Sequence, residues 1–110
     1  MTLQDIENLL KGIEVPVYYS ANPSEPSEDK YIVWAEDGDS SSSNADNKKR
    51  TKVTSGTIDL FTRAKFDPKK REIETILNSS SMAWSYNSHQ YEGDTLYHHH
   101  EWVFEVILSG

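Results

Sequence analysis

The chain of 110 residues contains no cysteine. This absence excludes a disulfide framework, a thiolate metal site and a cysteine nucleophile. The chain also has no run of about 18 consecutive apolar residues and no basic start followed by an apolar stretch, so it shows neither a membrane span nor a signal peptide. We therefore expect a protein that is made in the cytoplasm and does not contact a membrane.

Positive charge is scarce. Eleven lysines and arginines stand against eighteen acidic residues, which gives a formal charge of −7. Binding to DNA phosphates requires clustered basic side chains, so specific nucleic-acid binding is not expected. An acidic surface fits ordinary solubility, and it also fits a passage through which DNA moves without binding.

Apolar residues are few as well, at 35% of the chain. A chain of this length forms one domain, residues 1–110, because a smaller unit would bury too little surface. The aromatic residues must supply much of the core, since each buries about 150 to 250 Å² when packed. They exceed what two short helices can cover, so we expect some of them to face a partner.

The spacing of apolar residues predicts an α+β fold in the order α-β-β-β-α-β-β, with a mostly antiparallel sheet and both helices on one face. A first helix starts at a capping pair, Thr2 and Asp5, and stops near Gly12, whereas Asp67 and Pro68 open a second helix. We expect five strands, at residues 15–20, 30–36, 50–63, 82–91 and 96–108. The first two should pair antiparallel, Gly56 marks a candidate bulge, the last two form a hairpin, and residues 37–49 form a mobile loop.

One cassette, Thr57 to Trp102, runs through strand, capped helix, strand, turn and strand without interruption. It contains the segments DLFT, DPKKREIETILN, QYEGDT and HHEWVFEV. In residue type and spacing this cassette resembles the small tail-completion (tail-terminator) proteins of long-tailed bacteriophages. The resemblance covers roughly the C-terminal half of the chain and includes no catalytic signature.

The resemblance implies a structural protein of the virion, located at the head–tail junction and acting without enzymatic activity or cofactor. Such a protein assembles as a ring, hexameric in that family, and its partners are further copies of itself, the tail tube protein and the head–tail connector protein. It ends tail elongation, joins the tail to the connector and lets DNA pass through its lumen.

Several residues are candidates for contacts with a neighbouring subunit or the tail tube. The densest basic run consists of Lys48, Lys49, Arg50 and Lys52. It either begins a solvated strand or forms an arm that orders on a neighbour. Asp59 is unusual in mid-strand and could meet a basic residue of another subunit. Tyr91 and Tyr97 are candidate aromatic anchors.

The run His98, His99, His100 and Glu101 carries groups that ligate zinc. Alternation along a strand places His98 and His100 on the Trp102 face and His99 on the other, so at most two of the four can converge without His89. We therefore expect no metal site, with His99 exposed at an edge. A second hypothesis is that titration of these histidines makes assembly depend on pH.

Other functions remain open from the sequence. The nearest is a neighbouring component of the head–tail connector, which would share the α+β character. A small domain that binds proteins through its aromatic surface belongs to a different class. Catalysis by Asp59 with Glu101 or Glu105, or by a histidine–carboxylate metal site, is the least favoured because no nucleophile or phosphate loop accompanies these residues.

Overall fold

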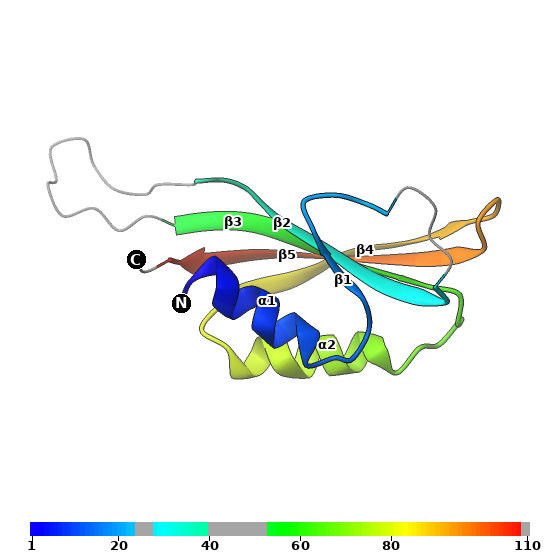
Figure 1. Ribbon diagram of the computed structural model, residues 1–110, viewed down its shortest axis with the longest axis horizontal. Helices are drawn as coiled ribbons and strands as arrows, with labels where there is room; N and C mark the ends of the chain where they lie inside the picture. Colours follow the sequence, from blue (N-terminus) through cyan, green and yellow to red (C-terminus); the bar gives the residue numbers. More distant parts are fainter. Residues whose placement is uncertain (24–27, 40–52, 109–110) are drawn as a thin grey trace, which may run out of the picture.

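The computed structural model describes residues 1–23, 28–39 and 53–108. Two helices pack against a five-stranded sheet (Figure 1). The elements are α1 (Leu3–Lys11), β1 (Val17–Tyr19), β2 (Lys30–Asp39), β3 (Val53–Thr62), α2 (Lys69–Ser79), β4 (Ala83–Glu92) and β5 (Tyr97–Ile107). The predicted α+β class and element order are confirmed.

The sheet has the strand order β1-β2-β3-β5-β4, and every neighbouring pair is antiparallel except β1 with β2. The predicted β4–β5 hairpin is present, with Glu92 opposite Tyr97. β3 lies at the centre of the sheet. Its side chains alternate between the two faces as predicted, with Ile58 and Leu60 buried on one face and Asp59 on the other.

The predicted antiparallel pairing of the first two strands is wrong. β1 and β2 are parallel, with Tyr18 opposite Val33. A tight antiparallel hairpin uses a loop of about two to five residues. β1 ends at Tyr19 and β2 begins only at Lys30, so the two strands are too far apart in the sequence for such a hairpin.

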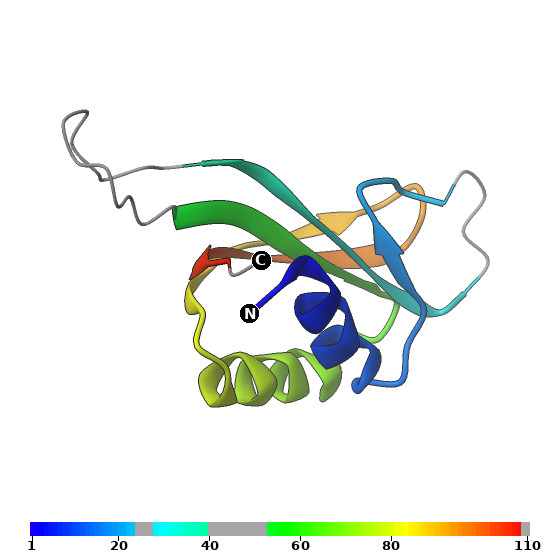
Figure 2. The same cartoon turned by 60° about the vertical axis from the view of Figure 1, so that its left-hand side comes forward.

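Both helices cover the same face of the sheet, as predicted (Figure 2). α1 begins with a complete capping box, in which the Thr2 hydroxyl accepts from the Asp5 N–H and the Asp5 carboxylate accepts from the Thr2 N–H. At α2 the Asp67 carboxylate accepts from the Lys69 N–H at 2.9 Å. Asp67 therefore provides an acceptor for a free N–H group at the start of α2, as predicted, although the regular helix begins at Lys69.

The main core lies between the helices and this face of the sheet. Trp34 and Trp102 are its largest fully buried side chains. Each indole also ties the sheet to a helix, because Trp34 Nε1 donates to Glu7 of α1 at 3.4 Å and Trp102 Nε1 donates to Glu74 of α2 at 3.0 Å. The aliphatic part of the core consists of Ile6, Leu10, Ile13, Ile32, Ile58, Leu60, Ile73, Leu77 and Val106.

The bulge expected at Gly56 lies instead in the facing strand. The β2–β3 register shifts between Glu36 and Gly38, which leaves Asp37 unpaired. Gly56 has a different role, because a Cβ there would lie 2.6 Å from the Phe104 ring and 2.3 Å from the Ala35 carbonyl oxygen. The Phe104 ring therefore packs directly over the Gly56 backbone.

The opposite face of the sheet carries no helix among the described residues, and it holds a second, smaller cluster. Tyr31 stacks on Phe61 at 4.8 Å, and Tyr97 meets Tyr31 edge-on at 5.5 Å. These three rings are buried. The chain thus has an aromatic core on each side of the sheet.

The loop expected at residues 37–49 begins later than predicted. Residues 37–39 continue β2 as part of its pairing with β3. The rest of that expected loop, from residue 40 onward, lies outside the described residues.

Candidate interaction surfaces

Asp59, a predicted interface residue, has a partner within its own subunit. Its carboxylate accepts a hydrogen bond from His99 Nε2 at 2.7 Å. His99 is not at a sheet edge as expected, because β5 lies between β3 and β4, and its ring stacks on Phe61 at 4.2 Å. Burial alone would lower the pKa of His99, but the hydrogen bond and charge of Asp59, aided by Glu92 and Glu101, raise it overall.

The two candidate tyrosines lie in different environments. Tyr97 is 2% exposed, its hydroxyl donates to the Glu28 carbonyl at 2.6 Å, and the Arg63 guanidinium lies 4.4 Å above its ring. Tyr97 therefore packs within the subunit and leaves almost no surface for a partner. Tyr91 on β4 is 57% exposed and remains accessible to one.

The basic run Lys48, Lys49, Arg50 and Lys52 lies outside the described residues. Its assignment as a contact arm stays a prediction from the sequence.

The remaining histidines gather on the helix-bearing face. Alternation predicted this for His98 and His100, whereas the bulge at Asn87 brings His89 to the same face as Tyr86. His89 Nε2 lies 2.9 Å from His98 Nδ1, and the His89 ring stacks on His100 at 4.4 Å. His100 is 5% exposed, and burial lowers its pKa to about 4, with nearby His89 and Lys70 adding to the effect. Within residues 1–23, 28–39 and 53–108, no three histidine or carboxylate side chains are placed to hold a metal ion.

A groove of about 590 Å³ opens between the start of α2 and the strands β4 and β5. Its lining is rich in basic and aromatic side chains, including Lys65, Phe66, Lys70, Arg71, Tyr86 and His89. It also contains the carboxylates of Asp67 and Glu74, which are paired with Lys30 and Lys70. Lys70 lies 4.4 Å above the Tyr86 ring and Lys65 lies 5.4 Å above the Phe66 ring, so two cations of the groove already contact aromatic side chains.

Two of the basic residues of this groove lack an acidic partner in the part of the chain that the structure describes. The other described lysines and arginines form ion pairs, at Lys11, Lys30, Arg63, Lys69 and Lys70. Lys65 and Arg71 do not, and both are exposed. The uncompensated positive charge of the described subunit is therefore concentrated at one place.

Phe66 projects from the rim of the same groove and is 87% exposed. The residues around it are fixed: the Thr62 hydroxyl donates to Asp67 at 2.6 Å and accepts from the Ala64 N–H at 3.1 Å. Lys30 Nζ adds an ion pair to Asp67 at 2.8 Å. Phe66 is thus held outward on an ordered connection between β3 and α2.

A hollow of about 200 Å³ lies at the other edge of the sheet, between α1 and β1. Its lining consists of Leu3, Gln4, Glu7, Tyr19 and Trp34. Tyr19 packs on Trp34 at 4.8 Å and is 46% exposed, and its hydroxyl donates to Glu36. The hollow therefore combines an aromatic surface with carboxylates at its margin.

β4 forms a long open edge of the sheet. It pairs with β5 along one side, and its other side faces no described strand. Natural edge strands are commonly protected by lysine, proline or short length. β4 has ten residues and contains neither lysine nor proline. A bulge at Asn87, between Tyr86 and Ser88, is its one protective irregularity.

Comparison with family models and with curated protein sequences gives no match. Comparison with solved structures finds this fold in a virion. A chain of the structure titled "Virion of native gene transfer agent (GTA) particle" superposes with a TM-score of 0.59 at 15% identity. The match covers 99% of this chain and 96% of that chain. At this identity the likeness is one of fold, and it extends over the whole of both chains.

The sequence did not single out Phe66, Lys65 or Arg71 as candidate contacts. Their signal is nevertheless present in KFDPKKR, where an aromatic residue flanked by cations directly precedes a helix start. The sequence does not show which of these cations form ion pairs in the folded protein. Neither helix is long and apolar enough to cross a bilayer in the described chain.

Proposed function

We propose that this protein is a structural component of a phage or prophage virion, located at the head–tail junction. There it caps the tail tube, ends tail elongation and joins the tail to the head connector as an oligomeric ring. The single observation that carries this proposal is the fold likeness to a virion chain over 99% of this chain and 96% of the other. The resemblance of residues 57–102 to tail-completion proteins supports the position at the junction.

The surfaces of the subunit suit assembly. β4 leaves ten residues open for pairing at one edge of the sheet, and the exposed Tyr91 lies on the same strand. The basic groove and Phe66 lie beside β4, because Tyr86 and His89 of that strand line the groove. An open edge strand can pair with a neighbouring subunit, and this possibility supports self-association into a ring.

The charge of the chain supports a passive conduit. With a net charge of −7, most of the surface would repel the DNA backbone, so DNA could move through the ring without binding. The proposed mechanism is geometric. The ring presents a top face that does not add further tube subunits, and it requires neither catalysis nor a cofactor.

A different class of function is favoured by one observation. The basic and aromatic groove beside an open edge strand could also receive an extended acidic peptide. In that alternative the protein is a small peptide-binding domain rather than part of a ring. A position in the neighbouring head–tail connector is the nearer alternative, since the fold likeness supports it equally.

Electron microscopy of an induced lysate in which this gene is deleted tests the proposal. Full heads beside unattached tails of abnormal length are expected for a tail-completion protein. Unattached tails of normal length would move the protein to the connector. Intact virions would contradict any role at the junction and would favour the peptide-binding alternative. Complementation with the wild-type gene serves as the control.

A further inference from the structure

The Phe66 knob, defined as Phe66 with the two unpaired cations Lys65 and Arg71, has the features of a protein contact. A single exposed apolar residue is ordinary on a protein surface. Phe66 differs because it is 87% exposed on a connection that is fixed by the buried Asp67. A connection that is already ordered loses little backbone entropy on docking.

The α1–β1 hollow matches this knob in size. Its volume is about 200 Å³, whereas an apolar cavity of about 150 Å³ is sufficient to hold benzene. Leu3 and Tyr19 offer apolar and aromatic surface to a phenyl ring, and the Tyr19 ring is supported from beneath by the buried Trp34 at 4.8 Å. The hollow can therefore accept the Phe66 side chain.

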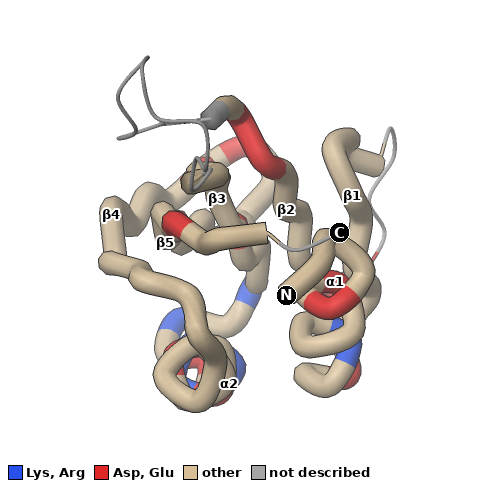
Figure 3. The backbone as a smooth tube through the Cα atoms, turned by 90° about the vertical axis from the view of Figure 1, so that its left-hand side faces the viewer, with Lys and Arg blue, Asp and Glu red and all other residues tan. Residues whose placement is uncertain are grey.

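The charges are complementary too. Glu7 lines the hollow, and Glu36 lies at its margin through the Tyr19 hydroxyl. Acidic residues mark this part of β2, whereas α2 carries basic residues interspersed with acidic ones (Figure 3). Lys65 and Arg71 beside the knob would thus meet carboxylates beside the hollow.

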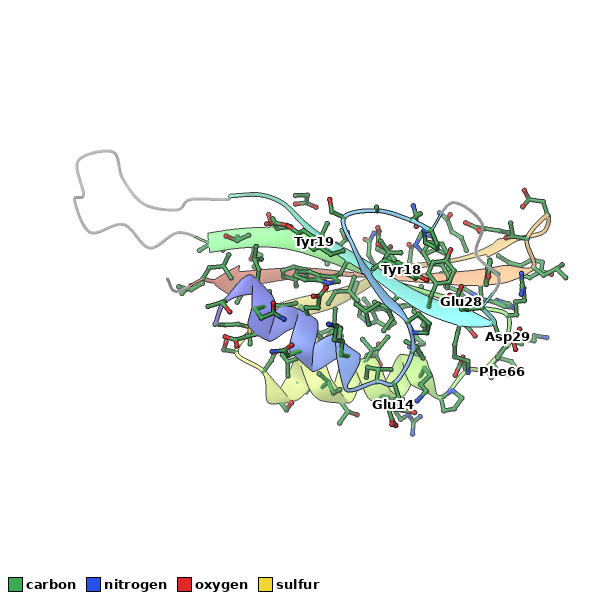
Figure 4. All side chains as sticks on the ribbon, viewed as in Figure 1. Glu14, Tyr18, Tyr19, Glu28, Asp29 and Phe66 are labelled. Atoms are coloured by element: carbon green, nitrogen blue, oxygen red, sulfur yellow. The ribbon has the colours of Figure 1, made fainter. Side chains whose placement is uncertain are left out.

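The two surfaces belong to opposite sides of one subunit. The hollow lies at the β1 edge, and the groove that carries the knob lies at the β4 edge of the same sheet. Tyr19 and Phe66 are well separated in the view of Figure 4. A knob and a hollow on different sides cannot satisfy each other within one subunit, but they join copies head to tail.

We propose that the Phe66 knob of one subunit inserts into the α1–β1 hollow of a second copy of this chain, forming a repeating head-to-tail contact. This inference rests on the proposed ring, and it names the surfaces that build the ring. The contact places the β4 edge of one subunit beside the β1 edge of the next. Electrostatic attraction between the cations beside Phe66 and the carboxylates beside the hollow orients the two copies.

The absence of cysteine allows a direct test of this contact by paired cysteine substitution. Ala64→Cys, at an exposed position beside the knob that leaves Phe66 in place, and Gln4→Cys are prepared as separate variants of the full chain, mixed and oxidised. A disulfide requires Cα atoms about 4.4 to 6.8 Å apart, so it reports close approach. We expect a covalent dimer in this mixture, and a covalent ladder from the chain carrying both substitutions. The matched control replaces Gln4→Cys with Ser85→Cys, an exposed site on β4 away from the hollow.

Cross-linking that is equally strong with the Ser85→Cys control, or absent from both mixtures, would overturn the contact. These results leave the virion role untouched, since that role is decided by the gene-deletion lysate. A ladder together with intact virions in the deletion lysate would instead support the contact and remove the proposed function.

Self-association of variants provides a second, independent measurement. Phe66→Ala should weaken association about tenfold or more in sedimentation or native mass spectrometry, as expected for a central aromatic anchor. Ile107→Ala, at a side chain that is 59% exposed, is the control and should leave association unchanged. Arg71→Glu should weaken association most at low salt. Wild-type oligomers that persist unchanged in Phe66→Ala, or a wild-type chain that stays monomeric, would contradict the proposal.

Discussion

His99 Nε2 donates a hydrogen bond to Asp59 Oδ1 at 2.7 Å across the central strands β3 and β5. The two residues are diagonal neighbours, since Asp59 is opposite Glu101 and Phe61 is opposite His99. Glu92 also lies within 4.0 Å of the His99 ring. The pair is therefore an internal link between strands, and it gives the fold a defined dependence on pH.

Asp59→Asn should reduce the free energy of unfolding most at acidic pH. Asp59 raises the pKa of His99, so the link stabilises the fold fully below the unfolded pKa and is lost as pH rises through the folded value. We expect a loss of about 1 to 2 kcal/mol near pH 5.5 that shrinks above pH 8. Urea unfolding at both pH values measures it, with Asp37→Asn as control. A loss that is independent of pH would contradict this assignment.

His100 should make the fold less stable as pH falls, which is opposite to the effect of His99. Its pKa falls from 6.5 to about 4 because the ring is buried, so the unfolded chain takes up a proton that the folded chain refuses. Stability should therefore fall by about 3 kcal/mol as pH drops from 6.5 to 4, at about 1.4 kcal/mol per pH unit. His100→Asn retains an acceptor for the Tyr86 hydroxyl and should flatten this slope. An unchanged slope in urea unfolding would show that another group is responsible.

Gly56→Ala should destabilise the fold by about 1 to 3 kcal/mol, since overpacking forces neighbours to shift. The added Cβ would lie 2.6 Å from the Phe104 ring and 2.3 Å from the Ala35 carbonyl oxygen. Gly93→Ala is the control, because nothing lies within 4 Å of its added Cβ. Thermal unfolding compares the two variants. Equal midpoints would mean that Phe104 can move away at little cost.

Asp67→Ala should cost about 3 kcal/mol, because it removes a helix cap and a charged partner together. Burial opposes the charged form of Asp67, but Lys30, Thr62 and the Lys69 N–H lower its pKa overall. This stabilisation is present at neutral pH and is lost as pH falls toward the folded pKa. Asp29→Ala removes an exposed ion pair with Arg63 and should cost under about 1 kcal/mol. Equal losses in the free energy of unfolding for these two variants, measured by chemical denaturation, would contradict the structural role of Asp67.

Local signals in the sequence were sufficient for most of the fold. The capping box at Thr2, the cap at Asp67 and the turn after Glu92 act within a few residues, so their chemistry is readable from neighbours in the chain. Alternation along β3 and β5 likewise assigned each side chain to a face. The helix-bearing face and the element order followed from these signals.

The errors arose where the outcome depends on residues far apart in the chain. β1 pairs parallel with β2, the bulge lies in β2 at Asp37, and the space above Gly56 is occupied by the Phe104 ring. Tyr97 was expected at an interface, but Arg63 and the Glu28 backbone cover it. Side-chain type alone does not reveal such coverage.

An acidic, cysteine-free α+β domain with two capped helices on one face of a sheet could be predicted from the sequence, because caps, turns and alternation are local properties. Which charges are compensated is known only from the folded chain, where Lys65 and Arg71 form no ion pair with any described residue and lie beside an exposed Phe66. Pairing and exposure depend on which distant segments meet, and that is fixed by packing of the whole chain.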